Sequence, residues 1–233
     1  MSLIFDPVDH RYRVGQRTIP SVTTRIQTAG LLGPGAAFYT TESAARGTRV
    51  HSACTDVDLG RPVTLPDDER GFVESYKAWR TLMQPTWTSM EQPHYSARYD
   101  TAGTADRLGT MAGTPLVLDF KTGGPAKWHS LQLAMYDLLH DDLPPQQRRR
   151  IALYLRIDGR LAQSVEYLDP ADYTLALTLM KRMDADGTDR PNAGHPDPSR
   201  HAHPQPEAQP GTLQSDHRAR RPRQPRRRPQ PRG

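Results

Sequence analysis

Three charged side chains within residues 102–124 could carry out chemistry: Asp106, Asp119 and Lys121. Asp119 and Lys121 are two positions apart, so on a strand they point to one face while Phe120 turns into the core. Two carboxylates at close range repel each other unless a cation lies between them, and hard oxygen ligands suit Mg²⁺ or Mn²⁺. A lysine beside them can hold or deprotonate a water. These are the parts for metal-assisted hydrolysis of a phosphodiester.

A hairpin would bring the two carboxylates together. Asp106 lies 13 residues before Asp119, and residues 110–114, "TMAGT", can form the turn between their strands. Two alternatives need no chemistry. Asp106 could be a turn residue after Gly103, and Asp119 with Lys121 could form a salt bridge on an edge strand.

Helical spacing and turn residues predict the surrounding elements. A short N-terminal hairpin should turn near Gly15, and a helix should follow with Ser21 or Thr23 as its cap. A second helix is expected at roughly 41–57. A third helix begins after Pro66. The side chains expected on its core face are Phe72, Val73, Tyr76, Trp79, Leu82 and Met83.

The second half of the chain reads as strands and two helices. Short β-rich runs at 86–91, 94–99, 102–109 and 115–121 are separated by turn residues. A helix at 128–143 should bury Leu131, Met135, Leu138 and Leu139. An Asp158-Gly159 turn predicts a hairpin between 149–157 and 160–168, and Asp169-Pro170 opens a last helix through Leu175, Leu179 and Met183. We therefore expect an α/β fold with a central mixed β-sheet flanked by helices.

The motifs resemble those of a known superfamily. "RGTRVH", "GTADR", "LDFKTGG" and "QLAMY" occur in this order between Arg46 and Tyr136. The pattern is similar to that of PD-(D/E)XK nucleases, with the RecB-type and phage exonuclease branch the closest, and "IPSVTTRI" is similar to the start of phage-encoded members. The resemblance implies a restriction-endonuclease-like core.

The resemblance also implies roles for individual residues. Asp106 and Asp119 would ligate Mg²⁺ or Mn²⁺, the carbonyl of Phe120 would add an oxygen, and Lys121 would orient or activate the attacking water. His51 matches the motif histidine that reaches the same metal, and Glu91 matches a further carboxylate one strand upstream. Gln132 and Tyr136, four apart on a helix, would face the site and help to position the DNA and the lysine; Tyr136 could instead be a core residue, and His51 a structural one.

The composition limits cofactors and compartment. Cys54 is the only cysteine, so the chain holds neither an internal disulfide nor a four-cysteine iron–sulfur cluster. No signal peptide and no run of 18 apolar residues are visible, so a cytoplasmic protein without a membrane span is expected. No Walker-type phosphate loop occurs, so any helicase partner, or a single-strand annealing partner, would be a separate chain.

The last 50 residues differ in composition from the rest. Residues 184–233 contain 10 of the 22 prolines, 10 Arg against 6 acidic residues, and Leu213 as their one large aliphatic side chain. Such a segment cannot bury enough apolar surface to fold, so we predict a nuclease domain at 1–183 and a disordered basic tail at 184–233. The tail could bind phosphates non-specifically, or be a solvated segment without a partner.

The sequence thus predicts a metal-dependent DNA nuclease, with an exonuclease of phage-like recombination or replication favoured. An endonuclease on branched or specific DNA is one alternative. A non-catalytic DNA-binding subunit that kept the fold is another, although the intact Asp106, Asp119 and Lys121 argue against it.

Overall fold

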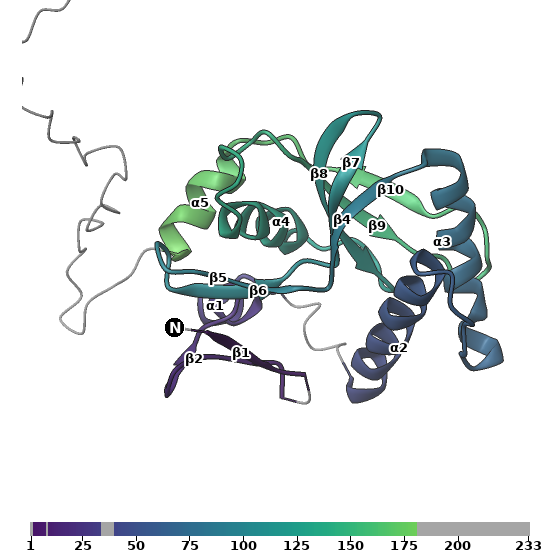
Figure 1. Ribbon diagram of the computed structural model, residues 1–233, viewed down its shortest axis with the longest axis horizontal. Helices are drawn as coiled ribbons and strands as arrows, with labels where there is room; N and C mark the ends of the chain where they lie inside the picture. The colour runs from purple at the N-terminus through teal and green to yellow at the C-terminus, as the bar shows by residue number, and fades with distance from the viewer. Residues whose placement is uncertain (1, 8, 34–39, 181–233) are drawn as a thin grey trace, which may run out of the picture. The chain divides into compact units, whose positions relative to one another are not determined.

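A five-stranded mixed sheet lies at the centre of the protein (Figure 1). The structure is a computed structural model that describes residues 2–7, 9–33 and 40–180. The strand order is β10–β9–β8–β7–β4, and only the β8–β9 pairing is parallel. The strands are β4 (Thr86–Met90), β7 (Arg107–Met111), β8 (Thr114–Lys121), β9 (Arg149–Tyr154) and β10 (Gln163–Glu166). The predicted tail, 184–233, and Met183 lie outside the described residues.

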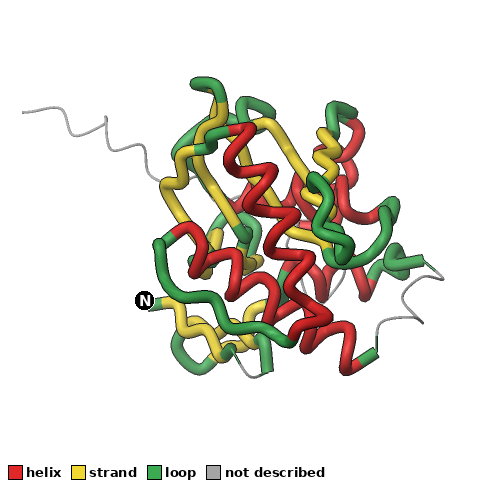
Figure 2. The backbone as a smooth tube through the Cα atoms, turned by 90° about the vertical axis from the view of Figure 1, so that its right-hand side faces the viewer, coloured by secondary structure: helices red, strands yellow, loops and turns green. Residues whose placement is uncertain are grey.

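Helices cover both faces of this sheet, as an α/β fold requires. On one face lie α1 (Val22–Thr28), α4 (Trp128–Leu139) and α5 (Ala171–Met180), which pack on Val117 and Ala152. On the other lie α2 (Thr41–Asp58) and α3 (Arg70–Met83), which pack on Leu118 and Phe120. Figure 2 views the protein from the side on which α2 and α3 lie, with helices in red and strands in yellow. The expected central mixed sheet flanked by helices is confirmed.

The side chains of β8 contribute to the cores on both faces of the sheet. Successive side chains of β8 point to opposite faces of the sheet. Leu116, Leu118 and Phe120 therefore enter the core under α2 and α3, while Val117 enters the core under α4. Asp119 and Lys121 belong to the α4 face by the same alternation. The helix α4 is the crossover that joins β8 to the parallel strand β9.

Smaller elements complete the N-terminal half. Strands β1 (Leu3–Asp6), β2 (Arg11–Val14) and β3 (Arg17–Ile19) form one antiparallel sheet, and β5 (Pro93–Ser96) pairs with β6 (Thr101–Thr104) in another. The predicted turn near Gly15 joins β2 and β3. Ser21 is confirmed as the cap of α1, because its hydroxyl accepts a hydrogen bond from the Thr24 N–H at 3.0 Å.

The helix positions follow the predicted pattern. The helices expected near 41–57 and after Pro66 are α2 and α3, the latter preceded by the short 3-10 turn η2 (Asp67–Glu69). In α4 all residues except Ser130 are buried, because the sheet, α1 and α5 surround it. Within the described residues, no helix is both long enough and apolar enough to cross a membrane.

Three predictions about local structure were wrong. Leu82 is exposed rather than part of the α3 core face. The run 102–109 is not one strand: it breaks at Ala105 and Asp106, where the chain leaves the β5–β6 sheet and enters the central one. The strands β9 and β10 pair Tyr154 with Gln163, so Asp158-Gly159 belongs to a longer loop and not to a two-residue turn.

Candidate active site

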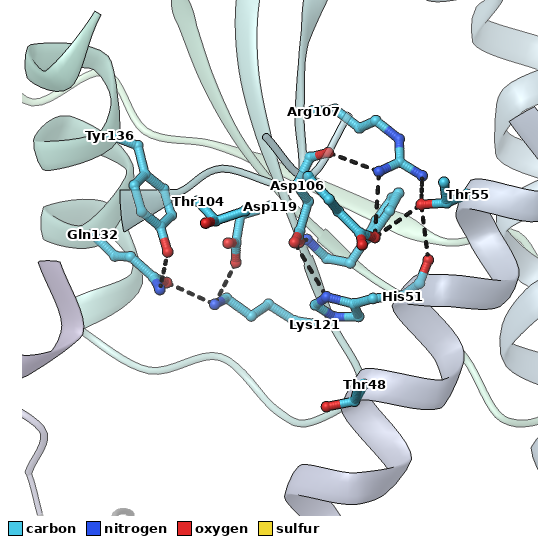
Figure 3. A network of polar contacts seen from close by, with 12 residues as sticks. Thr48, His51, Thr55, Thr104, Asp106, Arg107, Asp119, Lys121, Gln132 and Tyr136 are labelled. Carbon is cyan, nitrogen blue, oxygen red and sulfur yellow. Dashed lines mark hydrogen bonds and ion pairs between the residues drawn. The ribbon is translucent and has the colours of Figure 1, made fainter. Parts of the chain in front are cut away.

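The β7–β8 hairpin brings the two aspartates together. Its register pairs Met111 with Thr114, which leaves Ala112 and Gly113 as a two-residue turn with φ of 51° and 75°. Positive φ at both positions is typical of the turn that suits a twisted hairpin. At the other end Arg107 pairs with Leu118, so Asp106 reaches β8 and its Oδ2 accepts the Phe120 N–H at 2.6 Å. Asp106 and Asp119 lie next to each other in Figure 3, as predicted.

A chain of polar contacts connects this pair to α4. The Lys121 ammonium forms an ion pair with Asp119 and donates a hydrogen bond to Gln132 Oε1 at 2.7 Å. Gln132 Nε2 in turn donates to Tyr136 Oη at 3.2 Å. Gln132 and Tyr136 are buried on the same helical face, pointing toward the sheet (Figure 3). The structure therefore brings Gln132 to Lys121 and Tyr136 to Gln132.

His51 reaches the same cluster from the opposite helix layer. It lies in the middle of α2, and its Nδ1 is 3.2 Å from Asp106 Oδ1. The imidazole also packs edge-on against the Phe120 ring, with 5.5 Å between ring centroids. The structure thus places His51 beside Asp106, where the motif histidine was expected.

Glu91 and Phe120 take up neighbouring positions. The Glu91 N–H donates to the backbone carbonyl of Asp106 at 3.0 Å, but its carboxylate accepts a hydrogen bond from Thr55 at 2.8 Å and lies 3.7 Å from Arg107. Glu91 is therefore beside the aspartates in the backbone, with its carboxylate engaged elsewhere. In a strand the N–H and C=O of one residue face the same neighbour, so the Phe120 carbonyl faces the side of Asp106.

The pKa values of the two carboxylates are shifted in opposite directions. Loss of solvent raises the pKa of Asp119, which the Lys121 charge opposes and the Asp106 charge reinforces. Burial also acts to raise the pKa of Asp106, but the charge and hydrogen bond of His51 and the Phe120 N–H outweigh it, so that pKa falls below its usual value. For His51, burial acts to lower the pKa and Asp106 more than reverses this, so its pKa is raised.

One carboxylate oxygen is left poorly satisfied. Asp119 Oδ2 is buried and, within the described chain, accepts no hydrogen bond of proper geometry, although the Lys121 ammonium is in contact with it. We regard that contact as an ion pair without a directed hydrogen bond. A buried carboxylate oxygen in this state, next to a second carboxylate and an imidazole, matches the donor set of a divalent cation.

The site as it stands is not a preformed metal cage. Across the described residues, no group of three or more His, Cys, Asp or Glu side chains is arranged to hold a metal ion. The reason is visible in the contacts, because His51 is bonded to Asp106 and Lys121 to Asp119. Asp106, Asp119 and His51 would hold a metal by exchanging these contacts for coordination.

Two cavities flank the end of β8. The first, of about 510 Å³, is lined by Lys121 and His51 of the cluster. The second, of about 420 Å³, lies toward the β9–β10 loop. Four residues are shared by the linings of the two cavities: Arg46, Thr122, Gly123 and Gly124.

Sequence reasoning missed two donors in these walls. Arg46 was noted only as the first letter of a motif, and His129 was not singled out. The His129 ring is buried, its Nδ1 accepts the Ala126 N–H at 3.3 Å, and its Nε2 has no hydrogen-bond partner within the described chain. Burial and then the Lys121 charge lower the pKa of His129 to about 3, so it is a neutral donor through Nε2. Only the helical spacing of His129 from the predicted site residue Gln132 could have indicated it.

No protein-family model matches this chain, and no curated protein matches it either. The case for a function therefore depends on the geometry of this cluster and its two cavities.

Proposed function

We propose that the protein is a Mg²⁺- or Mn²⁺-dependent deoxyribonuclease with a PD-(D/E)XK core, and that it acts as an exonuclease in phage-like recombination or replication. The observation that carries the proposal is the cluster of Asp106, Asp119 and Lys121. Two buried carboxylates, one with an unsatisfied oxygen, lie beside an ammonium group at the wall of a cavity. A buried carboxylate oxygen without a directed hydrogen bond, beside other titratable groups, is typical of a site that binds a ligand.

Each residue of the cluster has a role in this proposal. Asp106, Asp119, His51 and the Phe120 carbonyl would hold the metal, which would polarise the phosphate and lower the pKa of a bound water. Lys121 is held from two sides by Asp119 and Gln132. Its remaining N–H can orient the attacking water or neutralise charge that develops on the phosphate. Hydrolysis then forms a bond from the water oxygen to phosphorus, breaks one phosphorus–oxygen ester bond, and returns a proton to the leaving oxygen.

One observation favours a second candidate, a DNA-binding protein without catalysis. Lys121 pairs with Asp119 and His51 contacts Asp106, so both carboxylates have partners inside the fold, and a protein that never binds a metal would need such partners. The two candidates differ in what happens to bound DNA.

The test is digestion of end-labelled linear DNA and closed circular DNA by the purified full chain. With Mg²⁺ or Mn²⁺ we expect the linear DNA to be degraded from its ends and the circle to survive, and a chelator should stop the reaction. Cutting of the circle would show an endonuclease. Binding without cleavage would favour the second candidate, and cleavage that resists the chelator would reject the metal mechanism.

A matched pair of acid variants controls for contaminants. Asp119→Asn should lose the activity. Asp67→Asn should keep it, because that side chain is 90% exposed, belongs to η2 and lines neither cavity. Equal activity in both variants would show that the cluster is not responsible.

A further inference from the structure

The two cavities meet over the segment that directly follows Lys121. Residues 122–124 and Arg46 line both of them, so the cavities border each other across one short stretch of backbone. Lys121 lines the first cavity only, and the 155–158 segment lines the second only. A ligand that starts at Lys121 and extends into the second cavity must therefore pass over residues 122–124 and beside Arg46.

Arg46 has donors that the described chain does not use. Its Nε is buried without a hydrogen-bond partner, and no carboxylate of the described residues lies within 4.0 Å of its guanidinium. The guanidinium carbon lies over the Phe72 ring, 5.9 Å from its centroid. Arg49, one turn further along α2, differs: it binds Glu42 at 2.8 Å and Glu69 through its Nε at 3.0 Å. A planar guanidinium with free donors is suited to a phosphate.

Gly123 and Gly124 are not required by the fold. A Cβ added to either would meet no atom of the described residues within 4 Å, and neither has the positive φ that excludes other residues. Glycine is also used where a backbone must approach a ligand closely. The missing side chains therefore leave the backbone of residues 123 and 124 accessible from the cavities.

The walls on both sides provide apolar surface. Trp128 and Leu32 line the first cavity, and Phe72 and Ile157 line the second. Volumes of about 510 and 420 Å³ are in the range of roughly 300–1,000 Å³ that holds a small organic ligand. Recesses of this size suit single unpaired nucleotides. Alternating apolar surface and phosphate donors are typical of single-strand binding sites.

The charges of the second cavity are nearly balanced without Arg46. Asp158 also lines this cavity, and it pairs with Arg156 at 3.3 Å and with Arg160 at 2.5 Å. Arg46 is the cation of the shared wall, and within the described part of the chain it forms no ion pair, although its charge helps to lower the pKa of Glu69. His129 adds a neutral donor on the side of the first cavity.

We propose that the two cavities form the path of a single DNA strand, with unpaired nucleotides on either side of residues 122–124 and one phosphate held by Arg46. Arg46 is a positioning residue here, since it lies beside the path and not among the reacting groups. The proposal rests on the proposed nuclease function, because Lys121 at one end of the path marks the phosphate to be cleaved.

The experiment measures binding and not cleavage. Fluorescence anisotropy of a short single-stranded oligonucleotide, and of a blunt duplex of the same length, is recorded with the full chain in Ca²⁺ over a series of salt concentrations. The variants are Arg46→Gln, Gly123→Ala and Gly124→Ala, with Arg61→Gln as the matched control at an exposed arginine. Thermal unfolding is measured for each variant.

The expected results separate a binding role from a structural one. Arg46→Gln should weaken single-strand binding by about tenfold and reduce the slope of log affinity against log salt by about 0.7, the value for one lost phosphate contact on a single strand. Gly123→Ala and Gly124→Ala should weaken binding while the unfolding midpoint stays equal or rises. Arg61→Gln should bind as the unaltered chain does.

The outcomes distinguish this proposal from the proposed function. An unchanged affinity and salt slope for Arg46→Gln, unaffected binding in both glycine variants, or tighter binding of the blunt duplex would each overturn the strand path, even if the protein cleaves DNA. If the variants behave as expected and the protein does not cleave, the path stands and the nuclease function fails.

Discussion

Two polar clusters lie near Phe120, and they differ in how completely their groups are paired. In the first, which we call the Asp58 cluster, Asp58 accepts hydrogen bonds from Tyr76, Arg80 and Arg107 at 2.6–2.9 Å. In the second, the Asp119 cluster, the members are Asp106, Asp119, Lys121 and Gln132. There an oxygen of Asp119 has no directed hydrogen bond within the described chain.

The difference indicates what each cluster is for. Arg107, fully buried, donates from its other two nitrogens to the Asp106 carbonyl at 2.7 Å and to Thr55 at 2.9 Å, so each of its three nitrogens has a partner and the Asp58 cluster is closed. A closed network fixes the position of α2 and α3 against the sheet. In the Asp119 cluster, Lys121 lines a cavity and Asp119 Oδ2 lacks a directed hydrogen bond within the described chain, which a purely structural network would not need. Stability should depend on the first cluster, and activity on the second.

The largest expected effect is on the closed cluster. Arg107→Met should lower the free energy of unfolding by roughly 3–5 kcal/mol, because it removes one partner of a buried ion pair and leaves Asp58 undercompensated. Denaturant unfolding measures this, with the exposed Arg61→Met as control. A loss below about 1 kcal/mol would mean that the Asp58 cluster is not a structural network.

A smaller effect is expected where α4 supports the Asp119 cluster. Gln132→Leu removes the acceptor of the Lys121 ammonium at similar volume. We expect cleavage to fall by roughly 10- to 100-fold, as for residues that hold a catalytic group in place, with little change in the unfolding midpoint. Tyr136→Phe removes only the hydroxyl that accepts a hydrogen bond from Gln132, so it should lower cleavage less than Gln132→Leu does. If both variants cleave normally, Gln132 is not part of the site.

The smallest effect is a pH dependence of stability without metal. The pKa of His51 is raised in the fold. Its contribution to the free energy of unfolding is therefore complete below the unfolded pKa of 6.5 and is lost as pH rises through the folded pKa. The pKa of Asp106 is lowered, so its contribution is complete above 3.8 and is lost on acidification. His51→Gln should therefore destabilise the protein more at pH 6 than at pH 9 in the presence of a chelator. An equal loss at both values would contradict the ion pair.

The sequence predicted the Asp119 cluster better than the Asp58 cluster, for a physical reason. Asp119 and Lys121 could be placed on one face from strand periodicity alone, and the turn at Ala112-Gly113 set the register that brings Asp106 to them. The Asp58 cluster joins residues up to 49 positions apart through side chains on three elements, and no local spacing indicates such pairing.

Predictions from local sequence also failed where tertiary contacts determine the structure. The break at Ala105 and Asp106 is set by competition between two sheets for one chain segment, and not by the propensity of 102–109. The proposed role of Arg46 was also not predictable, because only the folded structure shows that its Nε has no hydrogen-bond partner within the described residues.

The most direct test of the account is Asp119→Asn, measured for cleavage and for unfolding in the same preparation. Cleavage should fall by about 100-fold or more, because a metal ligand loses its charge at constant volume. Burial raises the pKa of Asp119, so the ionised form destabilises the fold as pH rises above 3.8 and through the folded value. At neutral pH with a chelator, the variant should unfold at the same temperature as the unaltered chain or higher. Near-normal cleavage together with a clearly lower unfolding temperature would show that Asp119 is structural, and would contradict the account.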